Sequence, residues 1–126
     1  MSSTDPRRLK AKLFRGLADS SRLAVLEALR AGPRCVTEVV AATRLSQPNT
    51  SAHLACLGNC GLVTRERRGK FVYYGIADMR VVQMLEDAAG MLDEIGPRVS
   101  RCARYEGPAG RRLAAGARRS RGRRVR

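Results

Sequence analysis

Two cysteines four residues apart, Cys56 and Cys60, are the residues whose type and spacing most directly suggest chemistry. They lie in the stretch HLACLGNCGLV, which has the pattern of a helix that ends at a glycine. Side chains at positions i and i+4 of a helix lie above one another on the same face, so two thiolates could clamp one ion. Soft-metal sites need three or four ligands, so this pair would have to be completed by another residue.

Cys102 is the candidate for the third thiolate, because it lies beyond Gly96-Pro97, where we expect the last helix to end and the chain to be free to fold back. Cys35 stands beside Val36 in an apolar setting and is better explained as a buried structural thiol. The residues alone leave three alternatives open for the pair: metal binding, inert thiols and redox sensing.

A helical wheel separates the pair from the hydrophobic core. With about 100° per residue, the buried stripe of this helix is formed by Thr50, Leu54 and Leu57. A second line, roughly 240° to 300° around the same wheel, is formed by Asn49, His53, Cys56 and Cys60. The cysteines are therefore expected to share a flank with polar residues that face the DNA groove or its edge.

The surrounding pattern predicts the elements that position this helix. Helices are expected at 6–17, from Asp19 or Ser20 to about residue 30, from Thr37, from a Ser46 cap to about residue 60, and from Asp78 to Gly96-Pro97. A β-hairpin is expected around residues 68–70. This order predicts a mainly α fold with a small β-hairpin, a winged helix-turn-helix. The first and last helices carry more apolar positions than a small monomer can cover, which predicts a homodimer built on them.

The first turns of a recognition helix carry base contacts, and a basic wing contacts phosphates or the minor groove. The helix candidates for DNA contact are Ser46, Gln47, Asn49, Thr50 and His53. The wing candidates are Arg65, Arg68 and Lys70. Gln and Asn can pair with adenine through both a donor and an acceptor, whereas Ser46 is expected to act mainly as the helix cap.

Composition agrees with a DNA-binding protein. The 126-residue chain has a net charge of +14, and eight arginines lie between residues 111 and 126, which favours a polyanionic partner such as double-stranded DNA. No apolar run is long enough to span a membrane and no secretory segment begins the chain, so we expect a cytoplasmic protein. One histidine and no nucleotide-binding loop argue against an enzyme. Residues 1–98 are expected to form the DNA-binding and dimerisation domain, and 99–126 a C-terminal segment with Cys102 and a basic, disordered tail.

The stretch LSQPNTSAHLACL, followed by GLV, a basic hairpin and YYGIAD, resembles the ArsR/SmtB family of metal-responsive winged-helix repressors. The resemblance covers about residues 8–95. It implies a homodimer that binds operator DNA when metal-free and is released when metal binds. The cysteine pair of common arsenic and cadmium sensors is absent, because Val40 and Ala42 stand where it would fall, and the last helix lacks the histidines of the zinc and nickel sensors.

The closest pattern is that of the CmtR-type cadmium and lead sensors, whose CLxxCGLV motif matches residues 56–63. This resemblance implies Cd(II) or Pb(II) as inducer and Cys56, Cys60 and Cys102 as ligands, with Cys35 not required; the N-terminal cysteine of that type is missing here. Zn(II) or As(III) remain alternative inducers, and an arsenite or antimonite sensor could use the same three thiolates. A thiol redox switch and a general nucleoid-type DNA binder are the rival functions.

Overall fold

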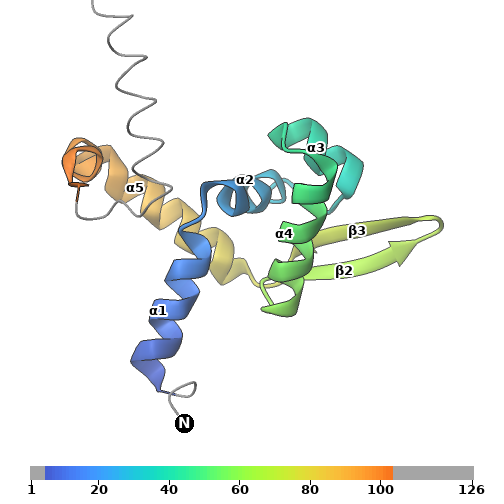
Figure 1. Ribbon diagram of the computed structural model, residues 1–126, viewed down its shortest axis with the longest axis horizontal. Helices are drawn as coiled ribbons and strands as arrows, with labels where there is room; N and C mark the ends of the chain where they lie inside the picture. The colour runs from blue at the N-terminus through green and yellow to red at the C-terminus, as the bar shows by residue number, and fades with distance from the viewer. Residues whose placement is uncertain (1–4, 104–126) are drawn as a thin grey trace, which may run out of the picture. The chain divides into compact units, whose positions relative to one another are not determined.

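The computed structural model describes residues 5–103, and its elements follow one another in the order expected of a winged helix-turn-helix (Figure 1). They are α1 (Pro6–Leu17), α2 (Ser20–Ala28), β1 (Arg34–Cys35), α3 (Val36–Thr43), α4 (Gln47–Asn59), β2 (Val63–Arg68), β3 (Phe71–Ile76) and α5 (Met79–Arg101). The chain forms two compact units, one up to Leu85 and one from Glu86. The expected fold class is confirmed. The arginine-rich stretch 111–126 lies outside the described residues.

The core of the first unit is aliphatic, as expected for a chain in which aromatic residues make up 4%. It is built where α2, α3 and α4 meet, and β2 and the first turns of α5 close it. The buried apolar residues are Val25, Leu26, Leu29, Val39, Leu54, Leu57, Val63, Val81 and Leu85. Three of them, Val25, Leu26 and Leu29, come from α2 and the residue that ends it, so α2 is the central support for the recognition helix.

Side-chain caps begin the helices where the sequence predicts them. Asp5 accepts a hydrogen bond from the backbone of Arg7, and Asp19 accepts one from Arg22, which starts α1 and α2. The N-cap of α3 is Cys35 rather than Thr37, and its backbone N–H donates to Glu38 at 2.9 Å. That hydrogen bond is the main cause of the lowered pKa of Glu38. The capping role is one that the apolar setting of Cys35 did not reveal.

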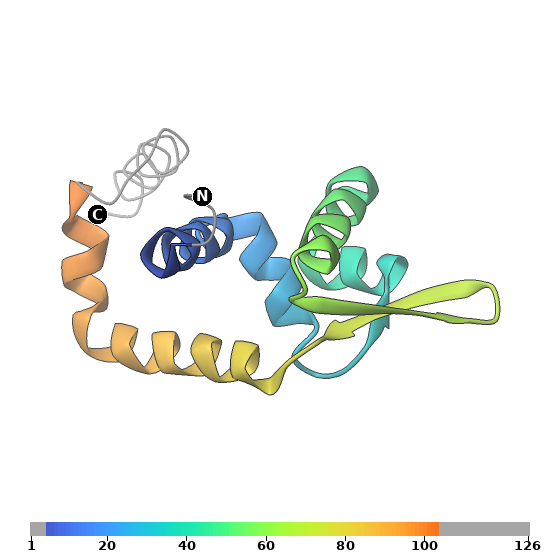
Figure 2. The ribbon, with the colours of Figure 1, turned by 90° about the horizontal axis from the view of Figure 1, so that it is seen from below.

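The wing is a two-residue hairpin that extends away from the helices in Figures 1 and 2. β2 and β3 pair in antiparallel register from Val63 opposite Ile76 to Arg68 opposite Phe71. Gly69 occupies the turn with a φ of 63°, a left-handed conformation that glycine adopts without strain. A third strand, β1, pairs with the other edge of β3 and was not predicted.

The last helix is longer than expected. Gly96 and Pro97 lie inside α5, which ends at Arg101, so the prediction that they terminate it is wrong. Figure 2 shows that α5 changes direction in its C-terminal part, as a proline inside a helix commonly causes. Cys102 follows the last residue of this helix, and its backbone N–H still donates to Val99 at 3.1 Å. The expected domain boundary between residues 98 and 99 falls inside α5.

Two helices carry large apolar side chains that the described chain leaves exposed. On α1 these are Leu9, Leu13 and Phe14. On α5 they are Met79, Met91, Leu92, Ile95 and Val99. Contiguous exposed apolar faces of this kind usually mark contact surfaces. No helix among residues 5–103 combines the length and apolarity needed to cross a bilayer.

Candidate DNA interface and thiol site

The N-terminal turn of α4 presents polar side chains to solvent. Ser46, Gln47 and Asn49 are all exposed. Ser46 Oγ accepts a hydrogen bond from the backbone N–H of Asn49 at 3.2 Å, so it is the N-cap of the helix, as predicted. Gln47 and Asn49 are therefore the two amide side chains that α4 offers at its exposed end, the position from which a recognition helix reads base edges.

Thr50 has a different place from the one expected. Its side chain is fully buried, and its hydroxyl donates to the backbone oxygen of Ser46 at 2.9 Å. A buried side chain cannot reach a base edge, so Thr50 is removed from the DNA-contact candidates. It forms one stripe with Leu54 and Leu57, both also buried, which is the stripe that the helical wheel indicates.

His53 faces α2 rather than open solvent. Its Nε2 lies 3.8 Å from Oδ2 of Asp19, the residue that caps α2, and its side chain is 20% exposed. His53 thus links the recognition helix to the start of its supporting helix. The flank that carries Asn49, His53 and the two cysteines therefore turns from solvent at its N-terminal end toward α1 and α2 along its length.

The wing carries the basic residues that the sequence indicates, in two different environments. Arg65 and Lys70 are exposed, and Arg65 lines a groove between α4 and β3 together with Asn59 and Tyr74. Arg68 is engaged within the wing, because its guanidinium donates to Glu66 at 2.8 Å and its Cζ lies 5.0 Å from the ring centre of Tyr73. A phosphate contact by Arg68 would have to compete with this ion pair, whereas Arg65 and Lys70 have no such competitor among the interactions described.

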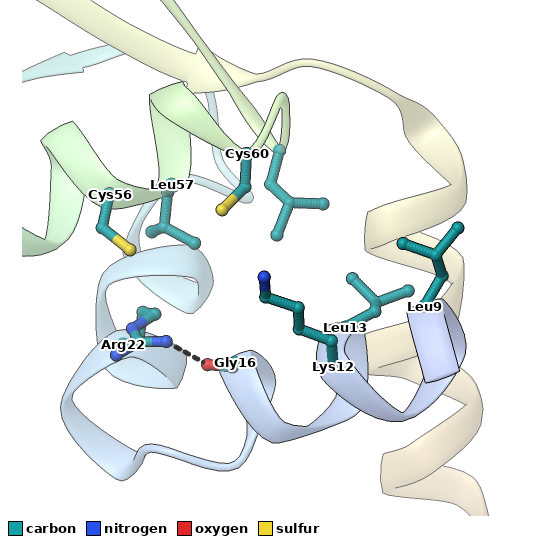
Figure 3. Close-up of a pocket in the computed structure, with 9 residues that line it drawn as sticks. Leu9, Lys12, Leu13, Gly16, Arg22, Cys56, Leu57 and Cys60 are labelled. Carbon is teal, nitrogen blue, oxygen red and sulfur yellow. Dashed lines mark hydrogen bonds between the residues drawn. The ribbon is translucent and has the colours of Figure 1, made fainter. Parts of the chain in front are cut away.

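The cysteine pair lines a cavity of about 300 Å³ between α4 and α1 (Figure 3). Cys56 and Cys60 are both free thiols with exposed side chains. Leu57 and Leu62 contribute apolar surface on the same side of the cavity as the thiols, and the α1 side is formed by Leu9, Lys12, Leu13 and Gly16. The wheel correctly moves the cysteines off the core stripe, but their flank faces α1 and not only the DNA edge.

Positive charge accompanies the thiols. Lys12 extends from α1 toward the α4 side of the cavity, and Arg22 donates to the backbone oxygen of Gly16 at 2.7 Å (Figure 3). None of the described residues that line this cavity is acidic. The sequence gives no signal for either cation, because residues 12 and 22 reach the thiols only through the packing of α1 and α2 against α4.

The pair satisfies part of the donor set that a soft metal requires. Cysteine thiolates select soft cations, and three or four of them complete a site. Within residues 5–103 no group of three or more His, Cys, Asp or Glu side chains is assembled to hold a metal ion. Cys102, half-buried after α5, belongs to the second unit. The third thiolate therefore stays a prediction, and Cys35 lies apart from the cavity as the cap of α3.

Comparison with known proteins identifies the fold and its relatives. A family model described as "Bacterial regulatory protein, arsR family" matches residues 19–65. The chain is 36% identical over 97 residues to a probable mercury resistance operon repressor of Streptomyces lividans, which covers 77% of this chain and 78% of that protein. It is 39% identical over 75 residues to the HTH-type transcriptional regulator CmtR of Mycobacterium tuberculosis, covering 60% of this chain and 64% of CmtR, less than two thirds of its length.

Among solved structures, one similar fold is the homodimeric winged helix-turn-helix DNA-binding domain of a possible ArsR-family transcriptional regulator from Mycobacterium bovis. The two share 30% sequence identity with a TM-score of 0.62, and the match covers 75% of this chain and 92% of that domain. The identity and coverage of the mercury-operon relative, the family match over the helix-turn-helix and the shared architecture agree. The chain belongs to the arsR family of bacterial regulatory proteins, which are DNA-binding transcriptional regulators and not enzymes.

Proposed function

We propose that this protein is a metal-responsive repressor that binds operator DNA as a homodimer when metal-free and leaves it when Cd(II) or Pb(II) binds Cys56, Cys60 and Cys102. The observation that carries this proposal is the position of the thiol pair. Cys56 and Cys60 are exposed on α4, the same helix that presents Gln47 and Asn49 at its other end. A ligand at the thiols therefore acts on the reading helix itself.

The DNA-binding half of the proposal rests on exposed side chains of suitable chemistry. Gln47 and Asn49 can form paired hydrogen bonds to adenine, and Ser46 combines capping with a possible phosphate contact. Arg65 and Lys70 would add sequence-independent affinity that falls with salt. His53, which lies beside Asp19, is kept as a candidate at the edge of the interface.

The homodimer is supported by the exposed apolar faces of α1 and α5 and by the homodimeric domain from Mycobacterium bovis. Helix-turn-helix dimers place two recognition helices in successive major grooves of a palindromic site. Leu13 and Phe14 of α1 and Ile95 of α5 are the residues that a second copy would cover first. Two copies of α4 would then have to keep one fixed spacing to read both half-sites.

The metal-binding half rests on the chemistry of the donor set and on the printed function of one relative, a probable mercury resistance operon repressor. Cys56 and Cys60 supply two soft ligands, and Cys102 would supply the third. Tying the segment after α5 to the C-terminal half of α4 would alter how the two reading helices are spaced. A coupling free energy of about 1–3 kcal/mol weakens operator binding about 5- to 150-fold.

The test measures binding of the full-length reduced protein to a fluorescent duplex that carries an operator selected by the metal-free protein. Cd(II), Pb(II), Zn(II) and As(III) are titrated separately into wild type and Cys102→Ser. We expect Cd(II) or Pb(II) to release wild type, and Cys102→Ser to bind DNA normally but to resist release. Normal release of Cys102→Ser by Cd(II) would rule out the third ligand.

Two further outcomes would each overturn part of the proposal. Release by As(III) alone would replace the inducer while keeping the three thiolates. Release by peroxide that a reductant reverses, with no response to any metal, would make the protein a thiol redox switch. Cys35→Ser is the matched control, since Cys35 caps α3 away from the cavity, and it should respond as wild type does.

A further inference from the structure

The cavity beside the cysteine pair has a property that a bare metal ion does not use. Its volume is about 300 Å³, and most of its lining is apolar, contributed by Leu9, Leu13, Leu57 and Leu62. An apolar cavity of about 150 Å³ is already enough to hold a benzene ring. The thiols of Cys56 and Cys60 therefore stand at the edge of a space that could hold an apolar group of about that size.

The described residues also set the number of sulfur ligands that this space offers. Two thiols line the cavity, and no third Cys, His, Asp or Glu among residues 5–103 joins them in a metal-binding group. A ligand matched to the cavity would therefore need two sulfurs and would bring its own apolar substituent. Inorganic arsenite needs a third sulfur, Cd(II) and Pb(II) carry no apolar group, and a monoorganic mercurial is satisfied by a single thiolate.

We propose that the cavity between α1 and α4 is a binding site for monoorganic trivalent arsenicals, with the arsenic held by Cys56 and Cys60 and the organic group in the apolar space. The reaction is R–As(OH)₂ plus two thiols giving R–As(S–Cys)₂ plus two waters. Two As–O bonds and two S–H bonds break, and two As–S bonds and two O–H bonds form. Arsenic stays trivalent, so no oxidant or reductant is required.

The charge of the cavity favours the same class of ligand. Lys12 and Arg22 bring two positive groups to its lining, with no acid among the described residues there. A neutral arsonous acid enters beside these cations without the Coulomb penalty that a free divalent cation meets. Helical i, i+4 spacing brings the two Cβ atoms to about 5–6 Å, near enough for both sulfurs to reach one atom.

The site would also connect two functional elements. Its lining comes from α4, which presents Gln47 and Asn49, and from α1, which carries the exposed apolar residues Leu9 and Leu13. An occupant thus contacts both the reading helix and a helix that we assign to the dimer. The inference rests on the proposed function only in that release from the operator is the expected consequence of occupancy; binding itself can be measured without DNA.

The experiment compares phenylarsonous acid, formed from phenylarsine oxide in water, with methylarsonous acid on the full-length reduced protein. Affinity is read by competition with a small dithiol, and the loss of free thiols is counted by colorimetric titration. We expect both compounds to consume two thiols and the phenyl compound to bind about tenfold more tightly or better, because a ring buries about as much apolar surface as one core side chain.

Three variants separate the parts of the site. Cys56→Ser should lose the two-sulfur capture of both compounds. Gly16→Leu should fill the cavity and bring the phenyl and methyl affinities close together, and Gly16→Ala is its conservative control, because a Cβ at residue 16 meets only Arg22 at 3.5 Å. Thermal melting of each variant confirms that it is folded. Cys102→Ser should bind both arsenicals as wild type does.

The outcomes distinguish this site from the three-thiolate site. If Cys102→Ser loses the phenylarsenical, or if wild type shows no preference for phenyl over methyl, the two-sulfur cavity site is refuted. If phenylarsonous acid binds as expected while Cd(II) and Pb(II) fail to release wild type from its operator, the cavity site stands and the proposed cadmium and lead response fails.

Discussion

Replacing Thr50 with valine should lower the stability of the protein without a matching loss of operator affinity. Thr50 is fully buried on α4, and its hydroxyl donates to the backbone oxygen of Ser46 at 2.9 Å. Valine keeps the branched shape and removes the hydroxyl donor. Residue 50 is thus assigned to the packing of the helix-turn-helix, in contrast to its neighbours Gln47 and Asn49.

The size of the effect follows from what is left behind. The oxygen of Ser46 also accepts the backbone N–H of residue 50 at 2.9 Å, so it remains hydrogen-bonded in the variant. The loss is therefore that of one net intramolecular hydrogen bond, about 0.5–1.5 kcal/mol, without the larger cost of an orphaned acceptor. For a domain of this size, about 1 kcal/mol lowers the melting temperature by roughly 4–8 °C.

Gln47→Ala is the matched comparison, because residue 47 is exposed on the same helix. Its stability should stay within about 0.5 kcal/mol of wild type. Its operator affinity should fall by about 1–3 kcal/mol if the amide reads a base. Both variants are measured by thermal unfolding at one protein concentration and by operator binding at one salt concentration. A Thr50→Val protein that melts like wild type but loses tenfold or more in operator affinity would refute the buried assignment.

Three other predictions follow from particular side chains. Arg80 lowers the pKa of Asp78 to about 2, first by side-chain and then by backbone hydrogen bonding; the resulting stabilisation is present above the ordinary carboxyl pKa and is lost as pH falls through about 2, so urea midpoints of Asp78→Asn and wild type should differ at pH 7 and converge toward pH 2. Ile95→Glu should turn the dimer into monomer by sedimentation, whereas Ser100→Glu, also on α5, should leave it dimeric. Lys70→Ala should reduce the steepness of the logarithmic dependence of operator affinity on salt by about 1, and an unchanged slope would remove its phosphate contact.

The sequence predicts most of the elements because local signals agree with the tertiary structure. Asp5-Pro6 and Ser46 mark helix starts that the structure confirms, and Gly69 marks the hairpin turn. These signals act within a few residues, through caps and preferred dihedral angles. The predicted winged helix-turn-helix is confirmed for the same reason, since its elements lie in chain order.

The differences arise where long-range packing decides. β1 has two residues, too few for a periodic pattern, and exists because Arg34 and Cys35 pair with β3. Pro97 stands inside α5, although prolines commonly end helices.

The candidate site was predicted in its residues but not in its surroundings. The helical wheel places Cys56 and Cys60 together and off the core stripe, and both are exposed on α4. The wheel describes one helix and cannot show which neighbour its flank meets. The cavity with Lys12 and Leu13 depends on how α1 packs, and the sequence around those residues shows only an amphipathic helix. Thr50 stood on the buried stripe of the same wheel, so its burial follows from the pattern, and only its assignment to DNA was wrong.

The central claim is that α4 both reads DNA and senses the inducer. It is tested most directly by measuring operator affinity of Cys60→Ser with and without Cd(II), beside wild type and Cys35→Ser. The account predicts that metal-free Cys60→Ser binds the operator as tightly as wild type and keeps that affinity when Cd(II) is added, while the other two proteins are released. Release of Cys60→Ser at the same Cd(II) concentration as wild type would contradict it.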